Sequence, residues 1–308
     1  RCLKDRGFVR FAVDPAETVK DGVPTYKTTL TFLVVDSAIR SGMTADVIME
    51  TGMLPNAIVI PAGTYQPFVI DGIEVDIYGV DKPKIAGSGA VVKITGEARV
   101  LLRGLELEET GGTGGWGVLS EGNYAHVVLD QMAIHGAEYG VAVLGQGSLT
   151  VSRSAIYGNQ RVGIQFEFAD FNLSSNLVFR NGSMNVDGNV GVAIGVGSGY
   201  FGHNTVVDNG KVGVSCAQTF TIHSNLIWDN TVNATMTCQS AGNVIGKGAA
   251  GRCQASVSAL PPSQWYLVQL GSQCVDPAPV SDSTPPAVDF DGQARDDWPD
   301  VGADEYVP

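Results

Sequence analysis

The sequence predicts an all-β solenoid, a parallel β-helix, and the first observation behind this prediction is a repeat. The line "FGHNTVVDNG", which starts at Phe201, returns in altered form as "IHSNLIWDN" from Ile222. Related lines begin at Leu129, Val151 and Leu173, so successive offsets are 22, 22, 28 and 21 residues. A period near 22 residues with Gly and Asn turns is typical of a stacked solenoid.

The second observation is the alternation of apolar residues within each unit. The unit from Gly140 contains three runs of period two, "VAVL" (141–144), "LTVS" (149–152) and "AIY" (155–157). The 3.6-residue periodicity of a helical solenoid is absent. Three short strands per coil, each pairing with the coils above and below at about 4.8 Å, make a parallel β-helix. Because one coil buries little, the stack supplies the stability.

Alignment of the units predicts the core as three inward columns, one for each strand of a coil, since alternate residues of a strand face opposite ways. The columns are Val118, Val141, Ile164, Val192 and Val214; Leu129, Val151, Leu173, Phe201 and Ile222; and Ile134, Ile156, Val178, Val206 and Ile227.

Three regions are expected along the chain. Residues 1–55 are predicted to form an N-terminal cap, with a short helix over 36–50, because an uncovered first coil would expose unpaired strand edges. Residues 56–246 are predicted to form the coils. Residues 247–308 are rich in Pro and Ser and are expected to pack on the stack as a C-terminal closing segment.

Composition excludes some partners. The 308 residues carry a net charge of −13, and the 19 Lys and Arg residues form no basic run, so nucleic acid and anionic membranes are poor partners. No window approaches the roughly 18 apolar residues of a membrane span. The sequence starts at Arg1 without a signal peptide, so we expect any targeting segment to have been removed or omitted.

Four of the five cysteines lie in the last third of the chain, at Cys216, Cys238, Cys253 and Cys274. They show neither C-x-x-C nor Cys/His metal spacing. We therefore expect two disulfides of open connectivity, which would indicate an oxidising compartment, with free buried thiols as the alternative. Cys2 is left over, either paired elsewhere or carrying a lipid anchor.

The coils "SRSAIYGNQRVGI" and "HNTVVDNGKVGV" resemble the repeats of right-handed parallel β-helix proteins of the pectate-lyase-like superfamily. Residues 56–87 are similar to the usual first coil of that group. The ending "VDFDGQARDDWPDVGADEY" (288–306) resembles the closing segment of a bacterial cell-surface and secreted subset, which more often has Pro where Asp296 stands. The resemblance implies a right-handed fold and an extracellular or cell-surface location. It leaves activity open, because this fold hosts lyases, hydrolases, adhesins and scaffolds.

Two Asn columns are predicted to be structural, because Asn tolerates left-handed turns and stacked amides can bond one another along the axis. They are Asn176, Asn204 and Asn225, and Asn159, Asn181, Asn209 and Asn230.

The position after the third inward column should point outward, and it is mostly aromatic. It holds His135, Tyr157, Phe179, Val207 and Trp228. Stacked rings stabilise a sheet face, and rings are also surfaces on which sugars pack. Two interpretations stay open: a strip covered by the C-terminal segment, or a binding surface formed by the four rings.

A weaker catalytic hypothesis rests on turns beside the first strand, which supply Arg161, Glu138, Tyr139 and Glu167. The substrate groove of pectate-lyase-like enzymes runs along this strand face, so the resemblance implies Arg161 as base or charge clamp and the glutamates as acid or metal groups. Elimination from a uronate polymer needs a base and a neutralised carboxylate, often through Ca²⁺. Ordinary solvated residues are the alternative.

The sequence therefore favours a secreted or cell-surface β-helix protein that binds a polysaccharide or a surface partner. A polysaccharide lyase or related uronate-active enzyme, and a structural surface assembly protein, are the alternatives. No cofactor is expected, with Ca²⁺ the ion that a lyase would add. The acidic cluster Glu106, Glu108 and Glu109 borders the insertion "GGTGGWG", which is a candidate cleft wall.

Overall fold

The computed structural model describes residues 9–20, 23–32, 57–182, 188–246, 286–295 and 302–303. The chain divides into two units, Arg1–Met53 and Leu54–Pro308. In the first unit β1 (Val9–Lys20) pairs with β2 (Val23–Phe32) in an antiparallel hairpin. The helix expected over 36–50 lies outside the described residues, and so do Cys2, Cys253 and Cys274.

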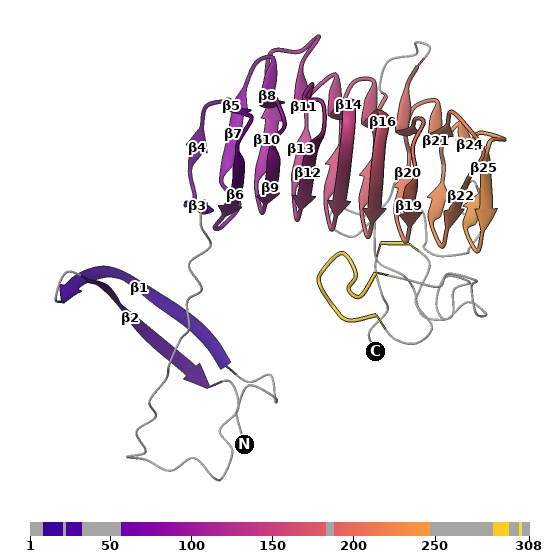
Figure 1. Cartoon of the computed structure of the whole chain (residues 1–308). Coiled ribbons are helices and arrows are strands. Elements are labelled where there is room, and N and C mark those ends of the chain that lie inside the picture. Colours follow the sequence, from indigo (N-terminus) through magenta and orange to yellow (C-terminus); the bar gives the residue numbers. More distant parts are fainter. Residues whose placement is uncertain are drawn as a thin grey trace. The chain divides into compact units, whose positions relative to one another are not determined.

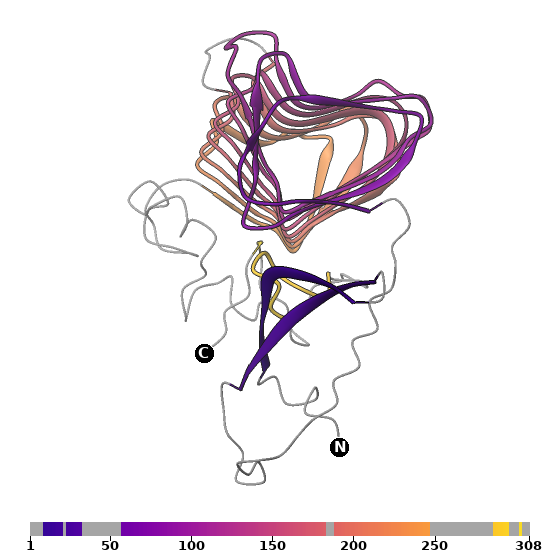
Figure 2. The same ribbon diagram turned by 90° about the vertical axis from the view of Figure 1, so that its left-hand side faces the viewer.

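The second unit is the predicted right-handed parallel β-helix, with strands stacked coil upon coil (Figure 1). Seen along the stack, the coils superpose as three-sided loops (Figure 2). The first face contains β5 (Phe68–Asp71), β8 (Ala90–Thr95), β11 (Trp116–Ser120), the first halves of β14 (Tyr139–Ser152) and β16 (Val162–Ser174), β18 (Val190–Ile194), β21 (Val212–Cys216) and β24 (Val232–Ala234).

The other two faces follow the same order along the axis. The second contains β3 (Ala57–Ile60), β6 (Glu74–Gly79), β9 (Arg99–Arg103), β12 (Ala125–Asp130), the second halves of β14 and β16, β19 (Gly199–Gly202), β22 (Phe220–His223) and β25 (Cys238–Ala241). The third contains β4 (Thr64–Tyr65), β7 (Lys84–Gly87), β10 (Glu106–Glu109), β13 (Ala133–His135), β15 (Ala155–Tyr157), β17 (Leu177–Phe179), β20 (Thr205–Val207), β23 (Leu226–Trp228) and β26 (Val244–Gly246).

One strand assignment differs from the prediction. The runs 141–144 and 149–152 were expected as separate strands, but they belong to a single strand, β14, and β16 is continuous in the same way. Pairing between β14 and β16 persists through the bend, with an irregular register only between Val143 and Gln146. The backbone hydrogen bonds between β14 and β16 therefore continue around this corner, and no loop interrupts them.

The three predicted inward columns are confirmed, and no member of them is more than 1% exposed. Register pairs such as Val141 with Ile164, and Ile156 with Val178, place equivalent residues directly over one another. Stacking one apolar residue per strand and coil gives a single continuous core, as a solenoid requires.

The asparagine columns form buried hydrogen-bonded ladders, but the predicted turn role was assigned one residue too late. Asn204 donates from Nδ2 to the Oδ1 of Asn225 at 3.0 Å, and Asn209 donates to Asn230 at 3.1 Å. The left-handed residue precedes each ladder Asn, as with His203 at φ 52° and Asp208 at φ 52°. The residue before each ladder Asn therefore makes the bend, while the buried Asn amide hydrogen-bonds to backbone groups inside the corner.

A glycine column at the opening of the first face was not recognised in the sequence. A Cβ on Gly140 would stand 2.5 Å from the carbonyl oxygen of Gly163, and one on Gly163 would stand 2.5 Å from that of Gly191. Neighbouring coils approach too closely there for any side chain, which explains why a glycine recurs directly before the inward Val or Ile of these units.

Of the four cysteines expected to pair, Cys216 and Cys238 form a disulfide on adjacent coils. Among the described residues, no helix is long and apolar enough to cross a membrane.

Candidate binding site on the third sheet face

The outward residues of the third face form a ring ladder. His135 and Tyr157 stack with ring centroids 4.9 Å apart, and Tyr157 and Phe179 stack at the same distance with an interplanar angle of 5°. This spacing is the distance between neighbouring strands, so ring faces cover one another along the axis. A ligand therefore meets ring edges here, whereas the sequence left open whether sugars pack on the four rings or the C-terminal segment covers them.

The ladder continues toward the first coils as a polar network. Lys84 contacts the Glu106 carboxylate at 2.8 Å and the Glu108 carboxylate at 3.0 Å, and His135 Nε2 lies 3.2 Å from Glu106. Side-chain exposure runs from 17% for His135 to 35% for Lys84. We call Lys84, Glu106, Glu108, His135 and Tyr157 the open half of the third face.

Charge and burial tune this open half. Burial acts to raise the pKa of Glu106, but hydrogen bonds from Lys84 and His135 outweigh it and lower the pKa below its ordinary value. Burial, followed by the Glu106 charge, raises the pKa of the Tyr157 phenol. The site thus presents the ionised Glu106 carboxylate as an acceptor, beside the Lys84 ammonium and a phenol that both stay protonated.

The other half of this face is apolar and covered. Leu177, Phe179 and Val207 are at most 3% exposed and form a cluster on which Trp228 and Phe290 pack. Phe290 belongs to the C-terminal segment. Hydrogen bonds pin that segment: Ser175 Oγ donates to the Val288 carbonyl at 3.0 Å, and the Ala303 amide donates to Thr205 Oγ1 at 3.0 Å.

We call Leu177, Phe179, Val207 and Trp228 the covered half. Of the four rings proposed to bind a ligand, Phe179 is 3% exposed, and Tyr157 and Trp228 are both partly buried against this cluster. Tyr157 therefore borders both halves, and its stacking partner His135 lies clear of the cluster.

The catalytic candidates are partly assembled at the start of the first face. Arg161 Nη1 lies 3.0 Å from a Glu138 oxygen, and its guanidinium carbon lies 5.4 Å from the Tyr139 ring centroid. Glu138 also accepts from the Gly114 amide at 2.6 Å. Glu167 is exposed at the other end of this strand half and shares no described contact with them. Three of the four residues are therefore together.

The electrostatics do not suit Arg161 to act as a base. The hydrogen bond to Glu138, and then the nearby Tyr139, raise the pKa of Arg161 above its ordinary value. Arg161 would have to lose its proton before it could act as a base, and this environment makes that loss harder. Within the described part of the chain, no group of three or more His, Cys, Asp or Glu side chains is placed to hold a metal ion.

Comparisons with known proteins agree with this architecture. The family described as "right handed beta helix region" matches residues 73–232, which is 160 of the 308 residues. The chain belongs to the right-handed β-helix family. Among solved structures, the crystal structure of pectate lyase Pel9A matches with a TM-score of 0.53 and 14% identity, covering 81% of this chain and 87% of that one. At this identity the likeness concerns the fold alone. No curated protein matches.

Sequence reasoning within this β-helix protein missed Lys84 and did not separate Glu109 from the other two residues of the acidic cluster. Lys84 pairs in register with Glu106, so an alignment extended to the first coils would have found it. The sequence grouped Glu106, Glu108 and Glu109 as one cluster, but Glu109 is 4% exposed and accepts hydrogen bonds from the amides of Gly111 at 2.8 Å and Gly112 at 3.1 Å. Glu109 shapes the glycine-rich insertion, while the other two carboxylates face Lys84.

Proposed function

We propose that this β-helix protein is secreted or displayed on the cell surface and binds a polysaccharide through the open half of its third face. The observation that carries the proposal is the Lys84–Glu106–Glu108–His135 network, in which four polar side chains are held together yet stay partly exposed. Groups already fixed by one another lose little side-chain entropy when a ligand binds.

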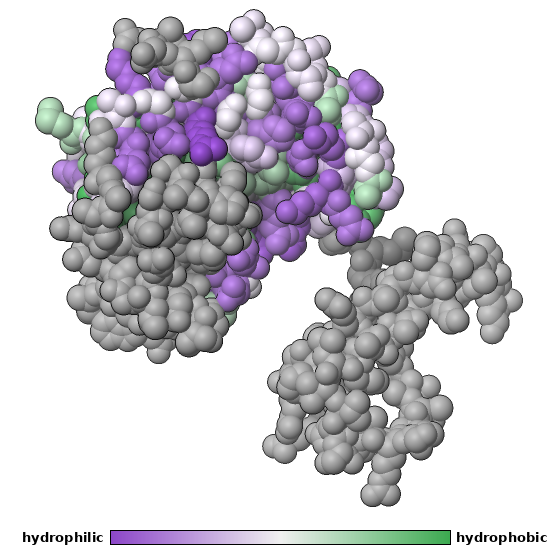
Figure 3. Space-filling model, turned by 180° about the vertical axis from the view of Figure 1, so that it is seen from behind, coloured by the Kyte–Doolittle hydropathy of each residue, from purple (hydrophilic) through white to green (hydrophobic). Residues whose placement is uncertain are grey.

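The chemistry of this network suits sugar hydroxyls. Each hydroxyl both donates and accepts, and the site offers carboxylate acceptors beside ammonium and phenol donors. The fold neighbour is titled a pectate lyase, which supports a polysaccharide as the class of ligand. The described surface seen from behind is mostly hydrophilic (Figure 3), as expected of a protein that works in contact with water. The Cys216–Cys238 disulfide is compatible with an extracellular location.

Binding is favoured over elimination because the candidate lyase set lacks a base. Arg161 is held protonated by Glu138, and Glu167 stands apart from both. A lyase at the first face stays an alternative that the same experiment can detect.

The test measures binding of the full chain to a panel of neutral and acidic polysaccharides, with release of unsaturated sugar products followed in parallel. Tyr157→Phe keeps the ring stack but removes the hydroxyl, and Glu108→Gln removes one acceptor charge. Each is expected to weaken binding by about fivefold to tenfold, the worth of one hydrogen bond to a charged or polar group.

Glu167→Gln is the matched control, since it makes the same chemical change on the first face and should leave affinity unchanged. Absence of saturable binding to every polymer would contradict the proposal. Unsaturated products that disappear in Arg161→Gln would establish the lyase instead.

A further inference from the structure

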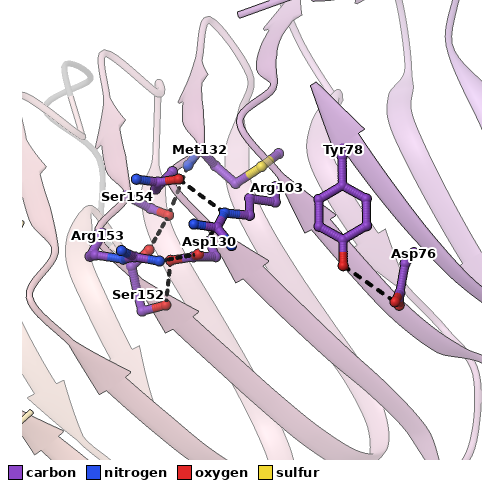
Figure 4. A network of polar contacts seen from close by, with 9 residues as sticks. Asp76, Tyr78, Arg103, Asp130, Met132, Ser152, Arg153 and Ser154 are labelled. Atoms are coloured by element: carbon purple, nitrogen blue, oxygen red, sulfur yellow. Dashed lines mark hydrogen bonds and ion pairs between the residues drawn. The ribbon is translucent and has the colours of Figure 1, made fainter. Parts of the chain in front are cut away.

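A second polar cluster lies where the second face turns into the third. Asp130, only 7% exposed, accepts from Arg153 Nε at 2.9 Å and from Ser152 Oγ at 2.9 Å, and it also pairs with Arg153 Nη2 (Figure 4). Arg103 reaches the same carboxylate, with Nε 3.3 Å from Oδ2. One buried carboxylate thus holds two guanidinium groups from different coils.

The cluster leaves donor groups unused. Arg103 Nε donates to Gln131 Oε1 at 3.0 Å, but within the described residues its two Nη groups have no partner, and its side chain is 43% exposed. Arg153 Nη1 faces Gly292 of the C-terminal segment, where even an added Cβ would stand 3.6 Å away. Asp130 already accepts hydrogen bonds from Arg153 and Ser152, so the carboxylate does not need Arg103 as a further donor.

Charge separates this corner from the open half. Two guanidinium groups against one carboxylate leave a net positive charge, in a chain whose total charge is −13. In the open half, the two carboxylates Glu106 and Glu108 outnumber the single ammonium of Lys84. An anionic group on a ligand would therefore be attracted to the Asp130 corner and repelled by the open half.

We propose that Arg103, oriented by Asp130 and Gln131 and supported by Arg153, binds a carboxylate or sulfate group of an acidic polysaccharide. A guanidinium fixed at its Nε edge presents its Nη donors in the planar fork that matches such oxyanions. The proposal rests on the proposed function and names the class of polymer. Arg103 ends β9 and Glu106 begins β10 only three residues later, so one sugar chain can contact both clusters.

The test compares an uronate-containing polysaccharide with the same polymer after reduction of its carboxyl groups. Arg103→Gln is expected to weaken binding of the charged polymer about tenfold while leaving the reduced polymer unaffected. Arg99→Gln is the matched control, because Arg99 is exposed on the same strand and pairs in register with His126 rather than with the cluster. It should change affinity little. If the chain binds the polymer and both variants lose the same amount of affinity, the proposal is overturned.

A second measurement separates failure of this site from failure of polysaccharide binding. The Nε–Hε signal of Arg103 is followed by NMR in the full chain during titration with sodium galacturonate and sodium sulfate. If no polymer binds but this signal shifts saturably, the proposed function fails and the anion site stands, and the stronger of the two salts shows which oxyanion it prefers. A signal that moves with neither salt, in a chain that binds no polymer, overturns the anion site as well.

Discussion

The two halves of the third face occupy the same register column yet have opposite surroundings. In the open half, Lys84, Glu106, Glu108 and His135 keep between 17% and 35% of their side chains exposed. In the covered half, Phe179 and Val207 are at most 3% exposed beside Phe290 of the C-terminal segment. Because the two halves share backbone and stacking, they differ only in their outward side chains and in the C-terminal segment that packs on one of them. Different coils of one solenoid face can therefore have different roles, one exposed to ligands and one covered.

The largest expected contrast between the halves is in stability. Phe179→Ala should reduce the free energy of unfolding by about 3–5 kcal/mol, because it removes a buried ring and leaves a cavity under Phe290. Tyr157→Ala, one coil away, should cost about 1–2 kcal/mol, since that ring is only half-buried. Chemical denaturation of the full chain measures both. Equal losses would show that the open half is as tightly packed as the covered half.

Removing the cover should affect the C-terminal segment more than the coils. Phe290→Ala is expected to weaken docking of this segment by about 1–2 kcal/mol, the worth of partly burying a ring. Hydrogen exchange should report it at the Gly302 amide, which donates to the Ser224 carbonyl at 3.0 Å, and at the Ala303 amide. Phe168→Ala, a ring 58% exposed on β16, is the control and should leave both amides unchanged. Unaltered exchange in Phe290→Ala would contradict the covering role.

Much of this comparison could be predicted from the sequence, and the rest depends on distant contacts. The period placed Ile134, Ile156 and Val178 in one column because a repeat determines its own register. Whether Phe179 is covered depends on a segment more than 100 residues later, as the Ser175–Val288 hydrogen bond spans 113 residues. No local pattern encodes that choice.

The charged residues show the same limit. Lys84 lies in an early coil whose repeat is weak, so it was not aligned with Glu106, although the two are register partners. Arg103 and Asp130 were missed because neither forms a known motif, and only the stacking of their coils brings them together. The repeat in the sequence is enough to predict the hydrophobic columns. A polar cluster between coils can be predicted only when the stacking of three strands is known.

A smaller effect is expected from breaking the network of the open half. Lys84→Met leaves Glu106 and Glu108 without their shared cation and should cost about 1 kcal/mol or less, because the pairs are solvent-screened. Lys93→Met is the control, since Lys93 contacts a single carboxylate, Glu121, at 2.7 Å and is similarly exposed. Thermal and chemical unfolding should rank Lys84→Met as the more destabilising of the two. The reverse order would indicate that the network does not act as a unit.

The smallest expected effect is a pH dependence of opposite sign in the two halves. The pKa of Glu106 is lowered below 4.5 in the folded chain, because the bonds from Lys84 and His135 outweigh burial. Its stabilisation is therefore complete above pH 4.5 and is lost as the pH falls through the folded pKa. Desolvation and then the Asp289 charge raise the pKa of Asp291, in the C-terminal segment, above 3.8. That segment is favoured at low pH and loses stability as the pH rises from 3.8 through the folded pKa.

Hydrogen exchange, corrected for intrinsic rates, between about pH 6 and pH 3 can resolve this difference. On acidification the β10 amides should become less protected relative to the Gly302 amide. Glu106→Gln should abolish the change at β10 and leave Gly302 as it was, because the glutamine has no carboxylate to protonate. If both regions lose protection together, and Glu106→Gln alters neither, the two halves are not electrostatically distinct and the comparison between them rests on packing alone.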